Sequence, residues 1–379
     1  MTVNRDMANL ARSATTVPTA TAPGKNLVQN GAMTVSQRGT GVILAGFDST
    51  TDSYGPDRFM MSGGGGPQNR GEIEHVTTGG PDGFPNFMRY DVTTAESAVA
   101  AGEITAIYHK IEAQNLQHLL YGTAGALAVT LQFYMRSPKT GTHCVALYQE
   151  DGARSYIREF TVAVADTWEQ HSVTFPGDAS GTINDDNGSG FRIVWPIIAG
   201  SNYQVAADGW AADNDYATSN QQNLADNVSN NIDLTGVQME VGSVATDFAH
   251  EDIGTTLQKA RRYYEELSPV TSGYGLFQWG MGPVGSGTSS ALGTIHFTVE
   301  KRASPTITAT AADWTFLKTT SSTSFGGGEM TCNSFSFAGA QPSGAWVSMA
   351  SATTGMTAGT ATWVQSTGAN KKITVSAEL

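Results

Sequence analysis

The stretch that decides the fold spans residues 232–250 and reads IDLTGVQMEVGSVATDFAH. In its first half, the apolar residues are spaced so that they could face a core, and the polar residues alternate outward. The apolar residues are Leu234, Val237, Met239 and Val241, and the polar ones are Gln238 and Glu240. This pattern predicts a strand. Gly242 follows where the strand must end, because glycine gives the backbone the freedom that a tight turn needs. The turn leads to Phe248, and we expect this aromatic ring to dock back on the protein.

Working outward, the same alternation recurs through residues 26–250, in short runs separated by Gly, Asp, Asn and Thr turns. The clearest predicted strands are residues 128–135, 144–149, 155–164, 169–175, 190–198 and 233–241. In the first run one face carries Val129, Leu131, Phe133 and Met135, while the other carries Thr130, Gln132 and Tyr134. Such alternation is typical of an antiparallel sheet with one packed and one more polar face. Two sheets of this kind stack into a β-sandwich.

The composition agrees with a β-rich chain and excludes several functions. The 379 residues include 43 glycines, and Asp and Glu outnumber Lys and Arg by 34 to 21, for a net charge of −13. Nucleic acid is therefore an unexpected partner, because phosphate binding draws on clustered Lys and Arg. No apolar run is long enough for a membrane-spanning helix, so no membrane insertion is expected. The N-terminus lacks the pattern of a secretory signal, and the two cysteines, Cys144 and Cys332, are expected to be buried or idle thiols.

Seven segments of the sequence resemble those of a known family. They are NLVQNGAMTVSQRGT (residues 26–40), Asp57-Arg58-Phe59, YHKIEAQNLQHLLYG (108–122), LQFYMRSPKTGTHCVALY (131–148), DTWEQHSVTFPGD (166–178), GVQMEVGSVATDF (236–248) and QKARRYY (258–264). Together they resemble a jelly-roll module that recurs in tail-fibre and related virion proteins of bacteriophages. The resemblance implies an all-β fold and a virion location, and no catalytic motif belongs to its pattern.

The expected organisation has four parts. Residues 1–25 form an N-terminal virion-docking arm, and residues 26–252 form an antiparallel jelly-roll β-sandwich like a carbohydrate-binding module. Residues 253–268 form a short connecting helix, because Leu257, Ala260, Tyr263, Tyr264 and Leu267 recur at helical spacing within residues 254–267. Residues 269–379 form a smaller C-terminal β-domain with Trp279, Trp314, Trp346 and Trp363 as its apolar anchors. The resemblance further favours docking of the arm on other virion proteins and a homo-oligomer, most simply a trimer.

A search for catalytic chemistry gives mostly negative answers. The seven histidines show no zinc-site spacing, and the sequence contains no P-loop and no GxSxG motif. The carboxylate pairs Glu72/Glu74, Asp185/Asp186 and Asp213/Asp215 could in principle serve a glycan-cleaving enzyme. The last two pairs lie in turn-like sequence, and no repeat of the kind found in a β-helical tailspike is visible. We therefore expect no enzyme and no catalytic, cofactor or metal residues, with a depolymerase tailspike as the weakest alternative.

Sugar binding would need exposed aromatic rings, because sugars stack their C–H faces on Trp and Tyr. The loop at residues 203–216 is the best candidate, with Trp210 as the platform and Asp208, Asp213 and Asp215 as possible glycan contacts. A tryptophan in such a module also commonly belongs to the core, and the three carboxylates could instead hold a structural calcium ion. The sequence thus predicts a structural virion component that contacts host-surface glycan, with a dedicated glycan-binding adhesin as the alternative.

Overall fold

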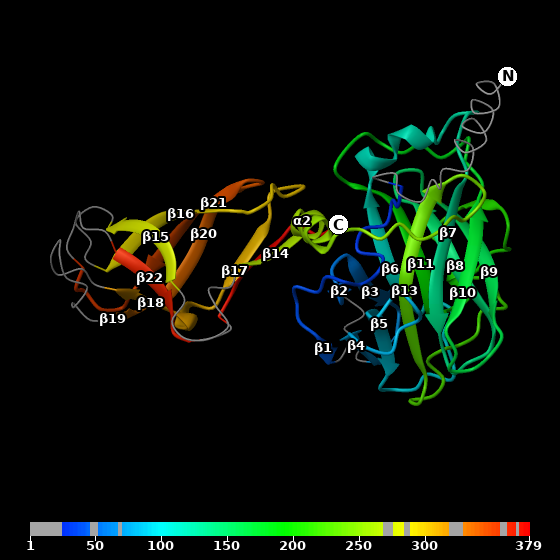
Figure 1. Cartoon of the computed structure of the whole chain (residues 1–379), viewed down its shortest axis with the longest axis horizontal. Helices are drawn as coiled ribbons and strands as arrows, with labels where there is room; N and C mark the ends of the chain where they lie inside the picture. Colours follow the sequence, from blue (N-terminus) through cyan, green and yellow to red (C-terminus); the bar gives the residue numbers. More distant parts are fainter. Residues whose placement is uncertain are drawn as a thin grey trace, which may run out of the picture. The chain divides into compact units, whose positions relative to one another are not determined.

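A computed structural model describes residues 25–45, 52–66, 70–267, 276–283, 289–317, 329–356, 362–368 and 371–379. The predicted arm therefore lies outside the described residues, except for Lys25. The chain divides into two compact units, residues 1–253 and 254–379. Each is described by itself, and both are built mainly from antiparallel strands (Figure 1).

The first unit is a jelly-roll β-sandwich made of two antiparallel sheets. The first sheet has six strands in the order β1 (Gly41–Ala45), β4 (Gly71–Val76), β5 (Phe87–Val92), β13 (Asn231–Val241), β7 (Val129–Arg136) and β10 (Glu169–Phe175). The second has seven strands in the order β12 (Trp210–Ala212), β9 (Arg154–Val162), β8 (Gly141–Gln149), β11 (Ser189–Ala199), β6 (Ile104–Glu112), β3 (Phe59–Gly64) and β2 (Ser53–Tyr54). The 3-10 helix η2 (Ala113–Leu119) follows β6, and η3 (Ser201–Tyr203) follows β11.

The core lies between the two sheets and confirms the predicted alternation. On β7 the inward residues Val129, Leu131, Phe133 and Met135 are all buried in one apolar cluster. The same cluster contains Trp195, whose ring meets the Phe133 ring edge to face at a centroid distance of 5.7 Å. This burial, repeated over both sheets, is the main term that stabilises the sandwich.

The decisive strand β13 follows the prediction with one exception. Leu234, Val237 and Met239 are fully buried. Leu234 and Val237 can share a face although they are three residues apart, because the pairing of β13 with β7 shifts register between Thr235 and Gln238. Val241 was expected in the core but is 41% exposed, since it is the last residue of its strand. Gly242 follows at φ +119°, as a turn-forming glycine should.

The family-like motif near the N-terminus is a structural clamp. Asn30 donates from Nδ2 to the carbonyl oxygens of Val35 and Asp57, both at 2.8 Å. The Asp57 carboxylate in turn accepts from the backbone and side-chain nitrogens of Gln37, at 3.1 and 2.6 Å. Arg58 donates from Nη2 to the carbonyl of Lys110 at 2.7 Å. These residues hold the first segment of the chain on the sandwich.

The second unit begins with α2 (Ile253–Arg261), which is shorter than predicted. Residues 264–267 were expected to continue the helix, but they form β14 (Tyr264–Leu267) because they pair with β23 (Ile373–Ser376). β17 (Thr306–Ala309) completes this three-stranded sheet. Tertiary pairing has overridden local spacing here.

A second, seven-stranded sheet completes this unit. Its order is β19 (Glu329–Thr331), β18 (Trp314–Leu317), β22 (Thr362–Ser366), β15 (Leu276–Pro283), β16 (Ser290–His296), β21 (Gly344–Ala350) and β20 (Ser334–Gln341), and the short 3-10 helix η4 (Ala311–Asp313) precedes β18. Trp314 is a core anchor, as predicted, and stacks on Phe335 at 5.9 Å. Trp346 is 60% exposed, so the expectation that it anchors the core was wrong. The side chains of Trp279 and Trp363 lie outside the described part of the chain.

Two further expectations can be checked directly. Cys144 and Cys332 are free and buried, as expected. Within the described ranges, no helix is long and apolar enough to cross a membrane.

Candidate functional site

The second half of the decisive stretch, residues 243–250, lies over the outer face of the first sheet. Buried polar side chains hold it there. Glu240 accepts hydrogen bonds from the backbone nitrogen and the hydroxyl of Thr246, both at 2.7 Å. Gln238 accepts from the Ala249 nitrogen at 2.8 Å, and Gln132 on β7 donates to the Thr246 carbonyl at 2.7 Å. The polar face of β13 is therefore buried but satisfied, which is the condition for its stability.

Phe248 docks as expected and closes an aromatic cluster. Its ring meets Phe84 edge to face at 4.8 Å and His250 at 4.8 Å. Phe84 also lies 5.5 Å from the ring of Tyr134 on β7. The bulge at Gly236 makes room for this cluster, because a Cβ atom there would lie 2.8 Å from Tyr134 Cδ2. The rings come from three segments that are far apart in sequence.

A cleft of 610 Å³ opens beside these rings, and we call it the aromatic cleft. Its lining combines rings with hydroxyl, amide and carboxylate groups, chiefly Phe84, Tyr134, Gln170, Ser172, Asp247 and Phe248. Gln170 and Ser172 are exposed on β10, and the Tyr134 ring is half-buried. Among the described residues, neither the Tyr134 nor the Ser172 hydroxyl has a hydrogen-bond partner. The cleft therefore offers an aromatic surface together with free polar groups, inside the size range of ligand pockets.

The strands β5, β13 and β7 are held together by an ion network around a buried carboxylate. The Asp233 carboxylate is fully buried and accepts from Arg89 Nε at 2.7 Å and from Arg136 Nε at 2.7 Å. The Arg136 guanidinium also lies 4.8 Å from the Trp168 ring centroid. Nearby, burial raises the pKa of Asp91 to about 6, against the opposing effect of Arg89. This network fixes β5, β13 and β7 relative to one another. Because β7 and β13 contribute to the cleft, its walls are formed before a ligand binds, which lowers the entropy cost of binding.

The outer face of the second sheet carries an aromatic cluster of a different kind. The Arg192 guanidinium lies 5.5 Å from the Tyr108 ring and 5.4 Å from the Tyr148 ring, and it donates to the Tyr216 hydroxyl at 2.9 Å. Burial raises the pKa of Tyr216 to about 12. Tyr108, Tyr148 and Tyr216 are all buried, so their faces are already used within the fold. This cluster is better suited to packing than to stacking on a sugar.

The predicted glycan contacts lie on one loop, but their side chains have separate partners. Trp210 is partly buried against the main core, with ring contacts to Tyr156 at 5.2 Å and to Tyr121 at 6.0 Å. Its indole nitrogen donates to the Pro176 carbonyl at 3.0 Å. Asp208 pairs with Arg158. This geometry favours a role for Trp210 in packing the core. Contact of glycan with Trp210 or Asp208 stays a prediction.

The remaining two carboxylates of that loop lie close to each other. Asp213 accepts from the Asn214 backbone nitrogen at 2.8 Å. Burial, and secondarily the charge of Asp213, raise the pKa of Asp215. Within the described ranges, no group of three or more His, Cys, Asp or Glu side chains is placed to hold a metal ion. Asp208, Asp213 and Asp215 are therefore not gathered into one such group.

Of the other carboxylate pairs, Glu72 and Glu74 both lie half-buried on β4, opposite Asp91 and Arg89. Asp186 accepts from the Gly188 nitrogen at 2.7 Å, as its turn-like sequence suggested. The aromatic cleft was missed by sequence reasoning, although Phe248 was expected to dock. The signal that could have found it is the row of outward-facing Gln132 and Tyr134 beside that docked ring.

No family model and no curated protein matches the chain. Solved structures similar to it include a domain of tailspike protein 4 of bacteriophage CBA120, at 11% identity and TM-score 0.32, over 58% of this chain and 22% of that one. A family 11 carbohydrate-binding module from Clostridium thermocellum is similar at 12% identity and TM-score 0.26, over 54% and 98%. The carbohydrate-binding and catalytic modules of xylanase 10B from the same organism are similar at 9% identity and TM-score 0.26, over 56% and 29%. These similarities concern the fold alone.

Proposed function

We propose that this chain is a structural subunit of a phage appendage whose sandwich binds host-surface glycan in the aromatic cleft. The observation that carries the binding role is the meeting of half-buried rings with unpaired hydroxyls in one pre-formed hollow. Sugars are recognised by this combination, since their C–H faces stack on rings while their hydroxyls exchange hydrogen bonds with amides and carboxylates.

Within this proposal each wall has a distinct role. Tyr134 supplies the stacking face and a hydroxyl, because its ring is half-buried and its neighbour Phe84 fixes its position at 5.5 Å. Gln170 and Ser172 on β10 offer amide and hydroxyl groups along one side. Asp247 offers a carboxylate from residues 243–250, which cover the first sheet, on the other side. A ring stacked on Tyr134 would thus have polar partners on both flanks.

The test is glycan binding by the full chain, on an array of bacterial surface polysaccharides, with Tyr134→Ala as the perturbation. One lost stacking contact of about 1 kcal/mol weakens a single site roughly fivefold. Tyr134→Phe keeps the ring and should retain most of the binding. Tyr203→Ala is the matched control, because Tyr203 is also half-buried but stacks on Tyr216, outside the aromatic cleft. Equal binding by the Tyr134→Ala and wild-type chains would refute the assignment of the cleft.

The appendage role rests on the family-like sequence segments, and it requires an attachment point. Lys25, where the described chain begins, pairs with Glu240 at 3.5 Å and donates to the Asp247 carbonyl at 3.0 Å. We propose that residues 1–25 are the virion-docking arm and that Lys25 joins it to the sandwich. Deleting these residues should leave a folded body that no longer enters particles. Normal incorporation of the truncated chain would contradict this role, and a dedicated adhesin would then be the better description.

Assembly and catalysis are the two remaining parts of the proposal. We propose a homo-oligomer, with a trimer favoured, because appendages are built around a symmetry axis and β-rich subunits gain by covering strand edges. Light scattering of the full chain checks this, and a strict monomer would remove it. We also propose binding without cleavage. Release of new reducing ends from a bound polysaccharide would instead favour the depolymerase alternative.

A further inference from the structure

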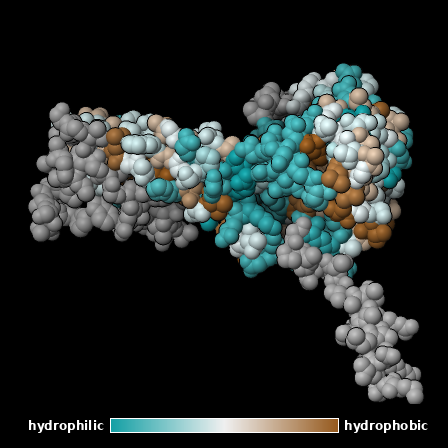
Figure 2. All heavy atoms as spheres, turned by 90° about the horizontal axis from the view of Figure 1, so that it is seen from above, coloured by the Kyte–Doolittle hydropathy of each residue, from teal (hydrophilic) through white to brown (hydrophobic). Residues whose placement is uncertain are grey.

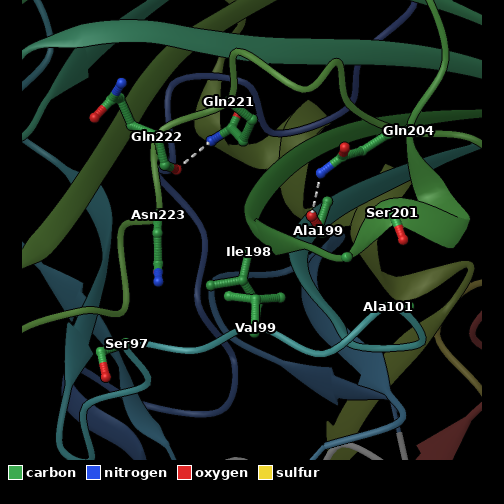
Figure 3. Close-up of a pocket in the computed structure, with 11 residues that line it drawn as sticks. Ser97, Val99, Ala101, Ile198, Ala199, Ser201, Gln204, Gln221, Gln222 and Asn223 are labelled. Carbon is green, nitrogen blue, oxygen red and sulfur yellow. Dashed lines mark hydrogen bonds between the residues drawn. The ribbon is translucent and has the colours of Figure 1, made fainter.

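A second hollow lies at the place where β6 begins and β11 ends (Figure 3). Its volume is 390 Å³, and its lining comes from three chain segments: Ser97, Val99 and Ala101 from the first, Ile198, Ala199, Gly200, Ser201 and Gln204 from the second, and Gln221, Gln222 and Asn223 from the third. None of these residues belongs to the aromatic cleft. This second hollow, which we call the amide pocket, is therefore separate from the proposed glycan site. At the small end of the range for ligand pockets, it has room for about one ring.

The amide pocket is polar but uncharged. Its described lining holds the side chains of Gln204, Gln221, Gln222, Asn223, Ser97 and Ser201, and no charged residue is among them. A charged ligand would give up hydration here without meeting an opposite charge, which is costly. A neutral ligand with both hydrogen-bond donors and acceptors suits this lining better.

Two of the amides fix the walls of the pocket. Gln221 donates from Nε2 to the Pro196 carbonyl at 3.1 Å and accepts at Oε1 from the Cys144 nitrogen at 2.6 Å. Asn223 donates from Nδ2 to the Glu96 carbonyl at 2.6 Å and accepts from the Ala225 nitrogen at 2.9 Å. These bonds tie the lining to β8, to β11 and to the loop before β6. The pocket is thus built before any ligand arrives.

Other polar groups of the lining remain open. Gln204 donates from Nε2 to the Ala199 carbonyl at 2.7 Å, which leaves its Oε1 as an acceptor. Among the described residues, the Gln222 amide and the Ser201 hydroxyl have no hydrogen-bond partner. Between these groups lies an apolar surface, which Figure 3 draws as Val99 and Ile198 between Asn223 and Ala199.

We propose that the amide pocket binds one neutral N-acetylated sugar residue through its acetamido group. The acetamido N–H is a donor for Gln204 Oε1, its carbonyl is an acceptor for the Ser201 hydroxyl, and its methyl group covers Val99 and Ile198. A sugar that lacks this group has no methyl group to place on Val99 and Ile198 and no amide N–H for Gln204, and a carboxylated sugar would bring an uncompensated charge. The site works independently of the aromatic cleft.

The test is saturation-transfer NMR on the full chain with N-acetylglucosamine and N-acetylgalactosamine. The strongest transfer should reach the acetyl methyl group, with a dissociation constant of about 1–10 mM for one small ring. Glucose and N-acetylneuraminic acid should bind at least tenfold more weakly. Absence of transfer from both N-acetylated sugars would overturn the proposal, and so would equal binding of glucose.

Two variants locate the site. Ala101→Phe fills the amide pocket, whereas Ala98→Phe makes the same change on the same loop at an exposed residue outside the lining. The first should weaken binding at least tenfold and the second should leave it unchanged. Gln204→Met, which removes the free acceptor, is a second way to weaken binding if Ala101→Phe disturbs folding. Binding that survives both pocket variants, or that Tyr134→Ala removes instead, would overturn the proposal and place the sugar in the aromatic cleft.

Discussion

Replacing Gly236 by alanine tests whether the bulge of β13 is what makes room for the aromatic cleft. Gly236 has φ +60°, and a Cβ atom built there would lie 2.8 Å from Tyr134 Cδ2 and 3.3 Å from Phe84 Cζ. Carbon atoms prefer separations of about 3.5–4.0 Å. The Tyr134 ring must therefore move by about 1 Å, or the backbone of β13 must move instead.

The expected cost has two parts. A left-handed conformation costs an alanine about 1–2 kcal/mol, of which about 0.4–1 kcal/mol is offset by the stiffer unfolded chain. Overpacking against the two rings adds about 1–3 kcal/mol. Gly41→Ala is the matched control, because Gly41 has φ +73° and nothing within 4 Å of its Cβ position. Gly236→Ala should thus destabilise the sandwich by about 2–4 kcal/mol, and Gly41→Ala by about 1 kcal/mol.

Differential scanning calorimetry of the full chain measures both. For a unit of this size each kcal/mol lowers Tm by about 2–4 °C, so Gly236→Ala should lower it by several degrees more than Gly41→Ala. In a Tyr134→Ala background the overpacking term should largely disappear, because the contact at 2.8 Å is gone. Equal shifts for the two glycine variants, or no coupling with Tyr134→Ala, would refute this reasoning.

Four further outcomes follow from the structure. Asp233→Ala leaves two guanidinium groups facing each other without their carboxylate and should cost about 3–5 kcal/mol by calorimetry; replacing all three residues of that network by apolar ones should recover part of it. Trp210→Ala should cost about 2–3 kcal/mol, since the ring is partly buried, and an unchanged Tm would return Trp210 to the surface. Lys301→Met removes the buried ammonium that lies 2.6 Å from Glu265 and leaves this carboxylate only Arg261, at 4.0 Å, as a counter-charge, so it should lower the Tm of the second unit only. Burial lowers the pKa of His109 and of three further histidines, so the unfolded state binds more protons and stability should fall as pH drops below about 6.5. The raised pKa values of Asp91 and Asp215 oppose this effect, but the four histidines outnumber them. A flat stability profile from pH 7 to 5 would contradict the expectation. The three further histidines are His75, His143 and His171.

The sandwich could be predicted because its strands carry their own periodicity. The inward row of β7 repeats every second residue, and β10 was expected at the bounds where it is found, Glu169–Phe175. The helix could not be bounded from sequence, because residues 264–267 keep helical spacing yet pair with a strand more than a hundred residues away. A local pattern carries no information about a partner that far along the chain.

The candidate site was less predictable for a related reason. Whether Trp210 is a platform or a core residue depends on Tyr156, Tyr121 and the Pro176 carbonyl, none of which is its sequence neighbour. The aromatic cleft likewise joins the loop at Phe84, the three strands β7, β10 and β13, and residues 245–250. The sequence identified Trp210 as an aromatic residue among carboxylates. It could not tell whether the ring is exposed, because exposure depends on how the folded chain packs around it.

The stretch at residues 232–250 ties the fold and the proposed site together. Its strand half supplies core residues and the bulge, while its second half is the wall that carries Asp247 and Phe248. Gln238 and Glu240 bind that wall and are themselves buried, so changing them leaves unpaired polar groups and lowers stability together with binding. Gln170, by contrast, is exposed and donates only a 3.5 Å bond to Gln132. The β10 wall is therefore where binding can be changed while the fold is left intact.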